Sequence, residues 1–223
     1  MPRMARLVIP DVPHHITQRG NRRQDVFFTP ADYAAYVAML KRACETNGVR
    51  CLAWCLMPNH VHLILTPPTA HSLQLAVSDL HRRYARQINR AHDWTGYLFQ
   101  GRFASYPMDS AHLLNAVRYV ENNPVAAGLV ACAEDWRWSS ARAHIVGKVD
   151  GVTDLGALEG AHGNWRGMLR DGWQASEQSD AIAKAIETSL NTGRPLGPRS
   201  FIERLEQLTG RSLTKTKPGP RRR

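Results

Sequence analysis

The sequence has few of the features that would place a protein outside the cytoplasm. Its 223 residues include four cysteines, too few for the disulfide-rich scaffold of a small secreted protein. No apolar run approaches the roughly 18 residues that span a bilayer. The apolar stretch after the basic N-terminus is too short for a signal peptide. We therefore expect a cytoplasmic protein without a membrane partner.

Acidic residues are also scarce. There are 19 Asp and Glu against 29 Lys and Arg, which gives a formal net charge of +10. Most of the excess is arginine, whose planar guanidinium donates paired hydrogen bonds to phosphate oxygens. This balance favours a nucleic-acid partner, with general solubility as the alternative. The chain has no GxxxxGK[ST] loop, so we expect no nucleoside triphosphate as a ligand.

The first half of the chain predicts alternating strands and helices. Residues 14–19 form a strand, and a helix capped by Thr29 runs from Pro30 to the stop at Asn47-Gly48. Apolar runs at 49–57 and 60–66, separated by Pro58-Asn59, indicate a hairpin. A basic amphipathic helix should cover residues 71–90.

The second half adds one strand and one helix before the composition changes. Residues 101–108 predict a short strand, and Asp109 or Ser110 should cap a helix that reaches Asn123 and ends at Pro124. This order predicts an α+β sandwich with a mostly antiparallel sheet. We assign residues 1–145 to this domain, and 146–223 to a glycine-rich linker, short helices including 200–208, and a basic DNA-binding tail.

Two histidines on the second hairpin strand are candidate metal ligands. Because strand side chains alternate, His60 and His62 should project from one face, with Val61 buried behind them. Two neutral imidazoles so placed can chelate a divalent ion. A zinc site with Cys51 and Cys55 is the alternative. Those cysteines lie about 13 Å apart along a strand, too far to share one ion.

Tyr119 is the candidate nucleophile. It shares a helix face with Asn115 and Asn123, which stand four residues on either side. A tyrosine on an amphipathic helix is by default a core residue. The polar neighbours around Tyr119 instead indicate a phosphate and metal environment, in which the Asn123 carbonyl could bind a hard cation.

The segments WCLMPNHVHLIL, RYVENNPVAAGLV and WRWSS together resemble the tyrosine transposases of the IS200 type, within them the REP-associated branch. The similarity covers about residues 3–145, although Ala126 stands where many relatives have arginine. It implies a ferredoxin-like HUH fold, a divalent Mg or Mn ion held by His60, His62 and Asn123, and Tyr119 as the nucleophile acting on single-stranded DNA.

The resemblance implies a nucleoid-associated enzyme that cuts a single strand beside a palindromic DNA hairpin and leaves a 5′-phosphotyrosine. Storing the bond energy in this ester allows later rejoining without ATP. Basic and polar side chains are candidates for binding the phosphates. The candidate DNA contacts are Arg19, Asn21, Arg22, Arg23, Arg82, Arg83, Arg86, Arg102, Asn115 and Arg118.

Two other functions stay open from the sequence. The first is a non-catalytic nucleic-acid-binding module on the same framework, and the second is an HUH replication-initiator nickase. A nickase of that kind is usually larger and joined to further domains. Both predicted motifs lie in one domain, so we expect a monomer that acts in cis, with a homodimer as the alternative.

Overall fold

The fold is built on a four-stranded antiparallel sheet. The computed structural model describes residues 6–161, 163–171 and 177–214. The strands β1 His14–Arg19, β2 Arg50–Met57, β3 His60–Thr66 and β4 Ala104–Pro107 lie in the order β2-β3-β1-β4. The helices α1 Pro30–Asn47 and α2 Ser72–Ala91 connect them in a β-α-β-β-α-β order. This is a ferredoxin-like arrangement, which confirms the predicted α+β fold.

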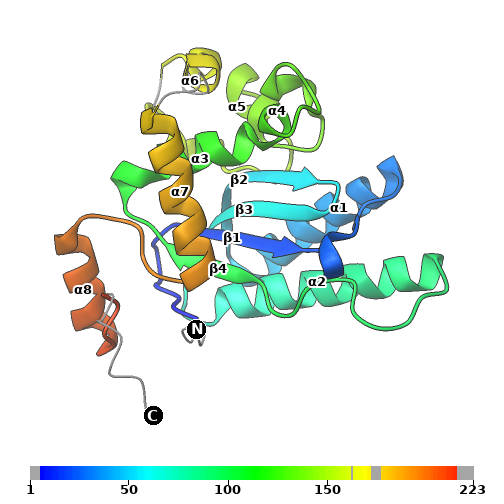
Figure 1. The fold of residues 1–223 in the computed structure, drawn as a ribbon, viewed down its shortest axis with the longest axis horizontal. Coiled ribbons are helices and arrows are strands. Elements are labelled where there is room, and N and C mark those ends of the chain that lie inside the picture. The colour runs from blue at the N-terminus through cyan, green and yellow to red at the C-terminus, as the bar shows by residue number, and fades with distance from the viewer. Residues whose placement is uncertain (1–5, 162, 172–176, 215–223) are drawn as a thin grey trace, which may run out of the picture.

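The two faces of the sheet carry separate apolar cores. Because strand residues alternate, Val61, Leu63 and Leu65 of β3 join the core under α1 and α2. Ile64 of β3 joins a second core with α3 Ser110–Glu121 and α7 Glu177–Thr192. Figure 1 shows α1 and α2 on one side of the sheet and α3 and α7 on the other. The sequence positions of His60 and His62 therefore face α3 and α7.

Local signals set several boundaries. Thr29 and Asp32 form a capping box at the start of α1, with Pro30 in its first turn. Gly48 ends the helix with φ 61°, a left-handed conformation that favours glycine. The hairpin pairs β2 with β3, and Met57 lies opposite His60. These predictions are confirmed.

Two boundaries differ from the sequence prediction. β4 begins at Ala104 rather than 101, because residues 99–101 form a turn against the end of β1, with Gly101 at φ 67°. α3 ends at Glu121 rather than Asn123, and Pro124 instead opens the short helix α4 Asn123–Ala126. Proline lacks the N–H that would continue α3, but it fits the first turn of a new helix.

The C-terminal third contains more regular structure than the linker predicted for it. Ile182, Ile186 and Leu190 of α7 recur every four residues and belong to the α3-side core, a helical signal that the sequence analysis missed. The predicted helix at 200–208 is confirmed as α8 Arg199–Thr209. The predicted basic tail follows this helix, and its residues 215–223 lie outside the described residues. The remaining elements are η1 Asn21–Arg23, η2 Ala133–Asp135, α5 Ala141–Val146, η3 Leu155–Leu158 and α6 Trp165–Asp171.

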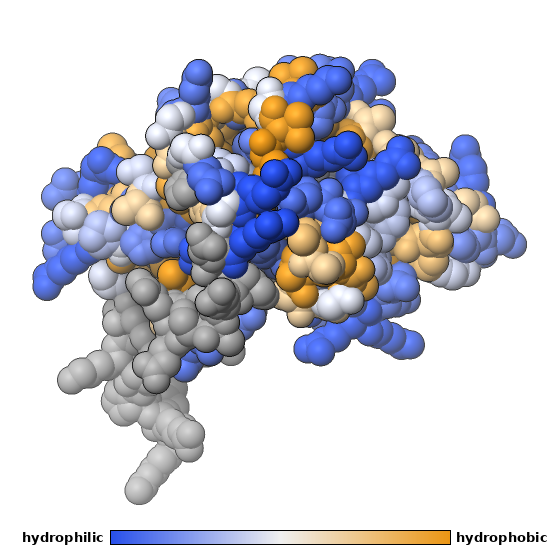
Figure 2. All heavy atoms as spheres, turned by 90° about the horizontal axis from the view of Figure 1, so that it is seen from above, coloured by the Kyte–Doolittle hydropathy of each residue, from blue (hydrophilic) through white to orange (hydrophobic). Residues whose placement is uncertain are grey.

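The surface seen from the side of α4, α5 and α6 is mostly hydrophilic, and apolar residues form small separate groups on it (Figure 2). In the part of the chain that the structure describes, no helix is both long enough and apolar enough to cross a membrane.

Candidate active site

A pocket of about 730 Å³, here called the central pocket, opens on the face of the sheet that carries α3 and α7. Its wall is formed by strands, the η1 turn, the loop before β4, and residues of α3, α4 and α7. Its lining residues are Thr17, Gln18, Arg19, Arg23, Met57, His60, His62, Gln100, Arg102, Ala104, Tyr119, Asn123, Ala126, Ala127, Ala183, Glu187, Leu190 and Asn191.

The central pocket brings together all four residues predicted to carry the chemistry. His60, His62, Tyr119 and Asn123 line it although they come from two separate segments of the chain. Three of the predicted DNA contacts also line the pocket, and all three are arginines. Those that line the pocket are Arg19, Arg23 and Arg102.

The other predicted DNA contacts lie outside the pocket. Asn21 and Arg22 belong to the adjoining η1 turn, and Asn115 and Arg118 lie on α3 without lining the pocket. The α2 arginines sit on a helix that packs against the opposite face of the sheet. Two of them, Arg82 and Arg83, form ion pairs with Asp79 of their own helix. The predicted phosphate contacts thus divide between two faces of the molecule.

The strand register places the two histidines beside β1. His62 lies opposite Thr17, and His60 lies opposite Arg19. Their ring centroids are 4.9 Å apart, and Val61 between them is fully buried in the other core. The predicted alternation is confirmed, and it aims both imidazoles at the pocket.

Each imidazole is oriented through its Nδ1 atom. His60 Nδ1 lies 2.6 Å from Asn59 Oδ1, and His62 Nδ1 lies 2.9 Å from His15 Nε2. His15 Nδ1 in turn lies 3.1 Å from the hydroxyl of Tyr106. A relay in which His62 Nδ1–H donates to His15 and His15 Nδ1–H donates to Tyr106 leaves Nε2 of His62 unprotonated. The same reasoning applies to His60, whose Nδ1–H donates to an amide oxygen.

Burial keeps the histidines of the pocket neutral. Desolvation, followed by the nearby Arg19 charge, lowers the pKa of His60 to about 4. Desolvation together with the charges of its histidine neighbours and Arg19 also lowers the pKa of His62 well below the usual value. Burial alone lowers the pKa of His15 to about 3. Neutral imidazole is the form that binds cations.

Tyr119 faces these histidines from α3. Its ring centroid lies 5.7 Å from that of His62 and 6.0 Å from that of His15, edge-on to both. The Asn123 side chain partly offsets the pKa shifts of both the Tyr119 hydroxyl and the His60 ring. Burial, and then the charge of Glu187, raise the pKa of Tyr119. The half-buried phenol therefore lies beside the two imidazoles and lines the pocket.

Asn123 keeps its predicted position relative to Tyr119 although α3 ends before it. Its amide donates to the Tyr119 carbonyl at 3.3 Å, the i to i+4 relation of a continuing turn. The prediction that the two share one helix is wrong, because Pro124 starts a separate helix. The prediction that they share one face is confirmed by the pocket that both line.

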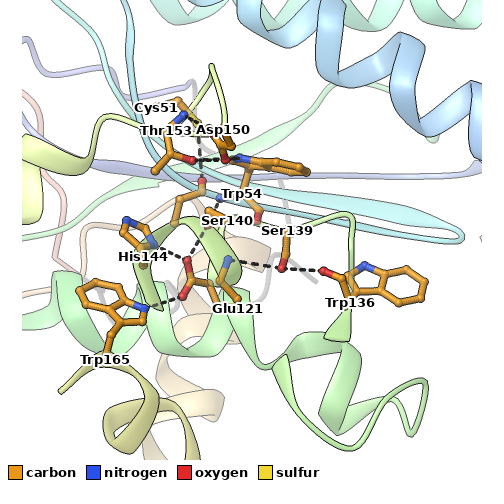
Figure 3. Close-up of polar contacts among 12 residues, drawn as sticks. Cys51, Trp54, Glu121, Trp136, Ser139, Ser140, His144, Asp150, Thr153 and Trp165 are labelled. Carbon is orange, nitrogen blue, oxygen red and sulfur yellow. Dashed lines mark hydrogen bonds and ion pairs between the residues drawn. The ribbon is translucent and has the colours of Figure 1, made fainter. Parts of the chain in front are cut away.

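A buried polar cluster holds the end of α3 that carries Tyr119. Glu121 is fully buried, and its carboxylate accepts hydrogen bonds from Ser140 Oγ, from His144 Nδ1 at 2.6 Å and from Trp165 Nε1 at 2.8 Å. Figure 3 shows these three side chains converging on Glu121 from α5, the start of α6 and the residue before α5. Buried charged groups are stable only when paired in this way.

The WRWSS segment joins this cluster to the sheet. Trp136 Nε1 donates to the Leu56 carbonyl at 3.0 Å, and the backbone of Ser140 donates to the Trp54 carbonyl at 2.9 Å. Ser140 Oγ also accepts from the Trp54 backbone at 3.0 Å (Figure 3). The segment thus fastens α3 against β2, the strand next to the one that carries both histidines.

The described residues of the pocket lack the closed set of four Cys and His ligands that holds a structural zinc ion. Among the described residues, no group of three or more His, Cys, Asp or Glu side chains could share an ion. Cys55 lies opposite His62 in the β2–β3 hairpin. Burial raises the pKa of the Cys55 thiol well above its usual value, so it stays protonated. Two imidazole nitrogens and the amide oxygen of Asn123 line the pocket and could hold a divalent ion there.

Several residues of the site were missed by the sequence analysis. His15, Tyr106 and the Asn59 side chain orient the two histidines, and Glu187 brings a carboxylate from α7. His15 alternates with Thr17 and Arg19 along one strand, so period-two spacing could have placed it on the pocket face. For Glu187 the sequence holds no such signal, because it reaches the pocket only through tertiary packing.

Comparisons with known proteins find relatives in both sequence and fold. The family model described as "Transposase IS200 like" matches residues 9–123. A protein of Haemophilus influenzae named as a REP-associated tyrosine transposase is 28% identical over 111 residues, which are 45% of this chain and 63% of that relative. A solved structure of a REP-associated tyrosine transposase bound to a REP hairpin superposes with a TM-score of 0.54 at 22% identity. The match covers 70% of this chain and 93% of that one, and it shows a shared fold.

Proposed function

Since this chain belongs to the IS200-like transposase family, we propose that it is a metal-dependent endonuclease and strand transferase for single-stranded DNA. It would cleave beside a DNA hairpin through a covalent 5′-phosphotyrosine. The observation that carries this proposal is the meeting of Tyr119 with His60 and His62 in one pocket, with ring centroids 5.7 Å apart for Tyr119 and His62.

Tyr119 supplies the nucleophile. Its phenol oxygen forms a bond to the scissile phosphorus while the bond from phosphorus to the 3′-oxygen breaks. The phenol loses its proton, and the departing 3′-oxygen gains one. The phosphate stays on the 5′ side as an ester of Tyr119, and attack by another 3′-hydroxyl reverses the step. The raised pKa of Tyr119 means that this phenol needs help to lose its proton.

His60, His62 and Asn123 would hold the ion, Mg or Mn, which when bound supplies Lewis-acid polarisation of the scissile phosphate. The Nδ1 contacts of both rings with Asn59 and His15 leave the two Nε2 atoms for this role. Arg19 lies opposite His60 on the neighbouring strand and would bind a phosphate oxygen.

The expected substrate is a single strand that adjoins a hairpin. A central pocket lined by Arg19, Arg23 and Arg102 suits a phosphodiester backbone. The solved relative of similar fold is bound to a REP hairpin, and we propose a palindromic hairpin of that kind as the partner here.

Cleavage would take place in cis. The phenol and both imidazoles that form the site come from one chain, within one pocket. This arrangement supports a monomer that cleaves DNA with its own tyrosine.

The decisive experiment is covalent trapping. A hairpin oligonucleotide with a labelled single-stranded tail is incubated with the protein and Mn, then analysed on a denaturing gel. We expect a protein–DNA adduct that Tyr119→Phe abolishes. Tyr97→Phe is the matched control and should leave the adduct unchanged. Binding without any adduct would support a non-catalytic binding module instead.

Complementation tests whether the site is complete in one chain. We expect no adduct when Tyr119→Phe is mixed with a His60→Ala, His62→Ala double variant, because each chain lacks half of a site. Adduct formation by the mixture would show that the tyrosine of one protomer serves the histidines of another, and would overturn the monomer.

A further inference from the structure

The exposed aromatic side chains lie on or against one loop, which connects α2 to β4. Among the described Phe, Trp and Tyr residues, three are exposed: Phe28 at 39%, Trp94 at 43% and Tyr97 at 87%. Trp94 and Tyr97 lie in the loop between α2 and β4, and Phe28 packs on that loop. Exposing apolar rings to water is unfavourable, so several exposed rings on one loop indicate a surface that binds a ligand.

Two of these rings form a small stack with a histidine. The Phe28 centroid lies 4.5 Å from that of His92 and 5.5 Å from that of Trp94, and His92 stacks on Trp94 at 4.6 Å and 28°. The loop is held to the helix, because Asn89 donates to the Gly96 carbonyl at 2.9 Å. The three rings therefore contact one another without a ligand, and such preorganisation lowers the entropic cost of binding.

The same loop leads directly into the central pocket. The Leu98 carbonyl accepts a hydrogen bond from Asn21 N at 2.8 Å, and Gln100 N donates to the Arg19 carbonyl at 2.8 Å. Gln100 and Arg19 both line the pocket. Three residues span at most about 10 Å, so Tyr97 lies near the pocket rim and Trp94 lies farther out along the loop. Figure 1 shows this loop running back from the end of α2 past η1 to β4.

The charge beside the loop suits a phosphodiester strand. The adjoining segment 19–25 contains Arg19, Arg22 and Arg23 against one acidic residue, Asp25. Asn59 Nδ2 donates to the Arg23 carbonyl at 3.2 Å, which ties this basic turn to the residue that orients His60. Gly20 is needed in the turn, because a Cβ there would lie 2.1 Å from the Gln24 carbonyl oxygen. Basic side chains thus lie where the loop reaches the pocket, which Arg19 and Arg23 line, whereas Asp93 is the acidic residue beside Trp94.

We propose that four side chains stack on unpaired bases of the DNA strand that enters the central pocket past Arg19 and Arg23. These side chains, Phe28, His92, Trp94 and Tyr97, are here called the aromatic platform. Aromatic rings beside a basic track are the chemistry that binds single strands, because every base offers a flat face to stack on. A duplex hides those faces. The inference rests on the proposed function for the identity of the strand in the pocket.

The test measures stacking separately from cleavage. Tyr119→Phe protein is titrated with a hairpin oligonucleotide whose single-stranded tail carries 2-aminopurine at one position at a time, at fixed salt. We expect fluorescence quenching at a few adjacent tail positions. Tyr97→Ala and Trp94→Ala should each weaken binding by about fivefold or more and abolish the quenching at one position. Tyr97→Phe keeps the ring and should restore both.

Two controls separate stacking from a general loss of binding. Leu208→Ala changes a side chain on α8 that is 67% exposed, and it should leave affinity and quenching unchanged. A hairpin without a tail should bind wild type, Tyr97→Ala and Trp94→Ala equally. Equal weakening with and without the tail would mean that the aromatic platform binds the hairpin itself, which would overturn the inference.

The two proposals fail in distinguishable ways. If wild type forms the covalent adduct but neither alanine variant changes tail binding or quenching, the platform is refuted and the enzyme stands. If quenching depends on Tyr97 but wild type forms no adduct with Mn, the platform stands and the proposed enzyme fails.

Discussion

The Nε2 atom of His15 lies 2.9 Å from Nδ1 of His62, although 47 residues separate them in the chain. This contact exists because β1 and β3 are neighbours in the sheet, with His15 paired to Ile64 and Thr17 to His62. Both rings are almost completely buried. The hydrogen bond fixes which nitrogen of His62 points into the central pocket.

Removing the His15 ring should weaken metal binding. In His15→Ala the His62 ring loses the acceptor for its Nδ1–H, so its orientation and tautomer are no longer fixed. Loss of such a partner typically reduces metal affinity by about 10- to 100-fold. Calorimetric titration of Mn into folded protein without DNA measures the effect. His15→Gln offers an amide oxygen in its place and should recover part of the affinity.

Tyr106→Phe provides the matched control for this relay. It removes the hydroxyl beyond His15 and leaves the His15–His62 contact in place, so Mn affinity should fall less than in His15→Ala. Mn binding by His15→Ala as tight as that of wild type would show that His15 does not orient the metal ligand.

The negative charge of Glu187 on α7 should weaken DNA binding and disfavour ionisation of Tyr119. It lines the same pocket as Tyr119 and raises the pKa of that phenol. In Glu187→Gln the pKa of Tyr119 falls, so the acid limb of the pH profile for adduct formation moves to lower pH. Affinity for single-stranded DNA should rise up to about fivefold, equivalent to about 1 kcal/mol.

Asn191→Ala tests whether any change to α7 has the same effect. It alters a neutral residue of the same helix that also lines the pocket, and the pH profile should not move. An unchanged profile in Glu187→Gln as well would refute the electrostatic role of Glu187.

Loss of the Glu121 carboxylate should destabilise the whole domain. Glu121→Ala leaves the Ser140 hydroxyl, His144 Nδ1–H and Trp165 Nε1–H without their buried acceptor. The expected decrease in the free energy of unfolding is about 3 kcal/mol or more, measured by urea denaturation.

Glu134→Ala is the comparison for Glu121→Ala. Glu134 pairs with Arg166, whose side chain is 53% exposed, so this change should cost under about 1 kcal/mol. Equal costs for the two substitutions would contradict the importance of the buried cluster.

Buried His81 should make the protein sensitive to acid. Burial lowers its pKa from 6.5 to about 3, and it pairs with the Tyr36 hydroxyl at 2.8 Å. Between pH 6.5 and 3 the unfolded chain takes up a proton at this position and the folded chain does not. The free energy of unfolding therefore falls with decreasing pH, by up to about 1.4 kcal/mol per pH unit for this residue.

His81→Gln keeps an acceptor for Tyr36 but cannot be protonated. Urea denaturation at pH 7 and pH 4 should show a smaller acid loss in this variant than in wild type. His71→Gln changes an exposed histidine and should leave the acid loss as it is. An unchanged difference between the two pH values in His81→Gln would refute the assignment.

Most of the secondary structure could be predicted from local sequence signals. The cap at Thr29, the glycine stop at Gly48 and the Pro58-Asn59 turn act over a few residues, so they could be read without knowledge of the fold. The sequence prediction ended α3 at Asn123 instead of Glu121, because a proline such as Pro124 can either stop one helix or open the next. The full length of α7 was not predicted, because the glycine-rich segment before it indicates irregular structure. The signal for the helix is the four-residue spacing of its apolar side chains.

The sequence by itself determined the chemistry available to this protein: two alternating histidines, a tyrosine four residues before an asparagine, and a basic excess. Only the tertiary structure decided which residues act together. It set His15 behind His62, brought Glu187 of α7 into the pocket and joined the exposed rings of Phe28 and Trp94. Strand register and helix docking depend on many weak long-range contacts at once, whereas caps, turns and alternation depend on near neighbours.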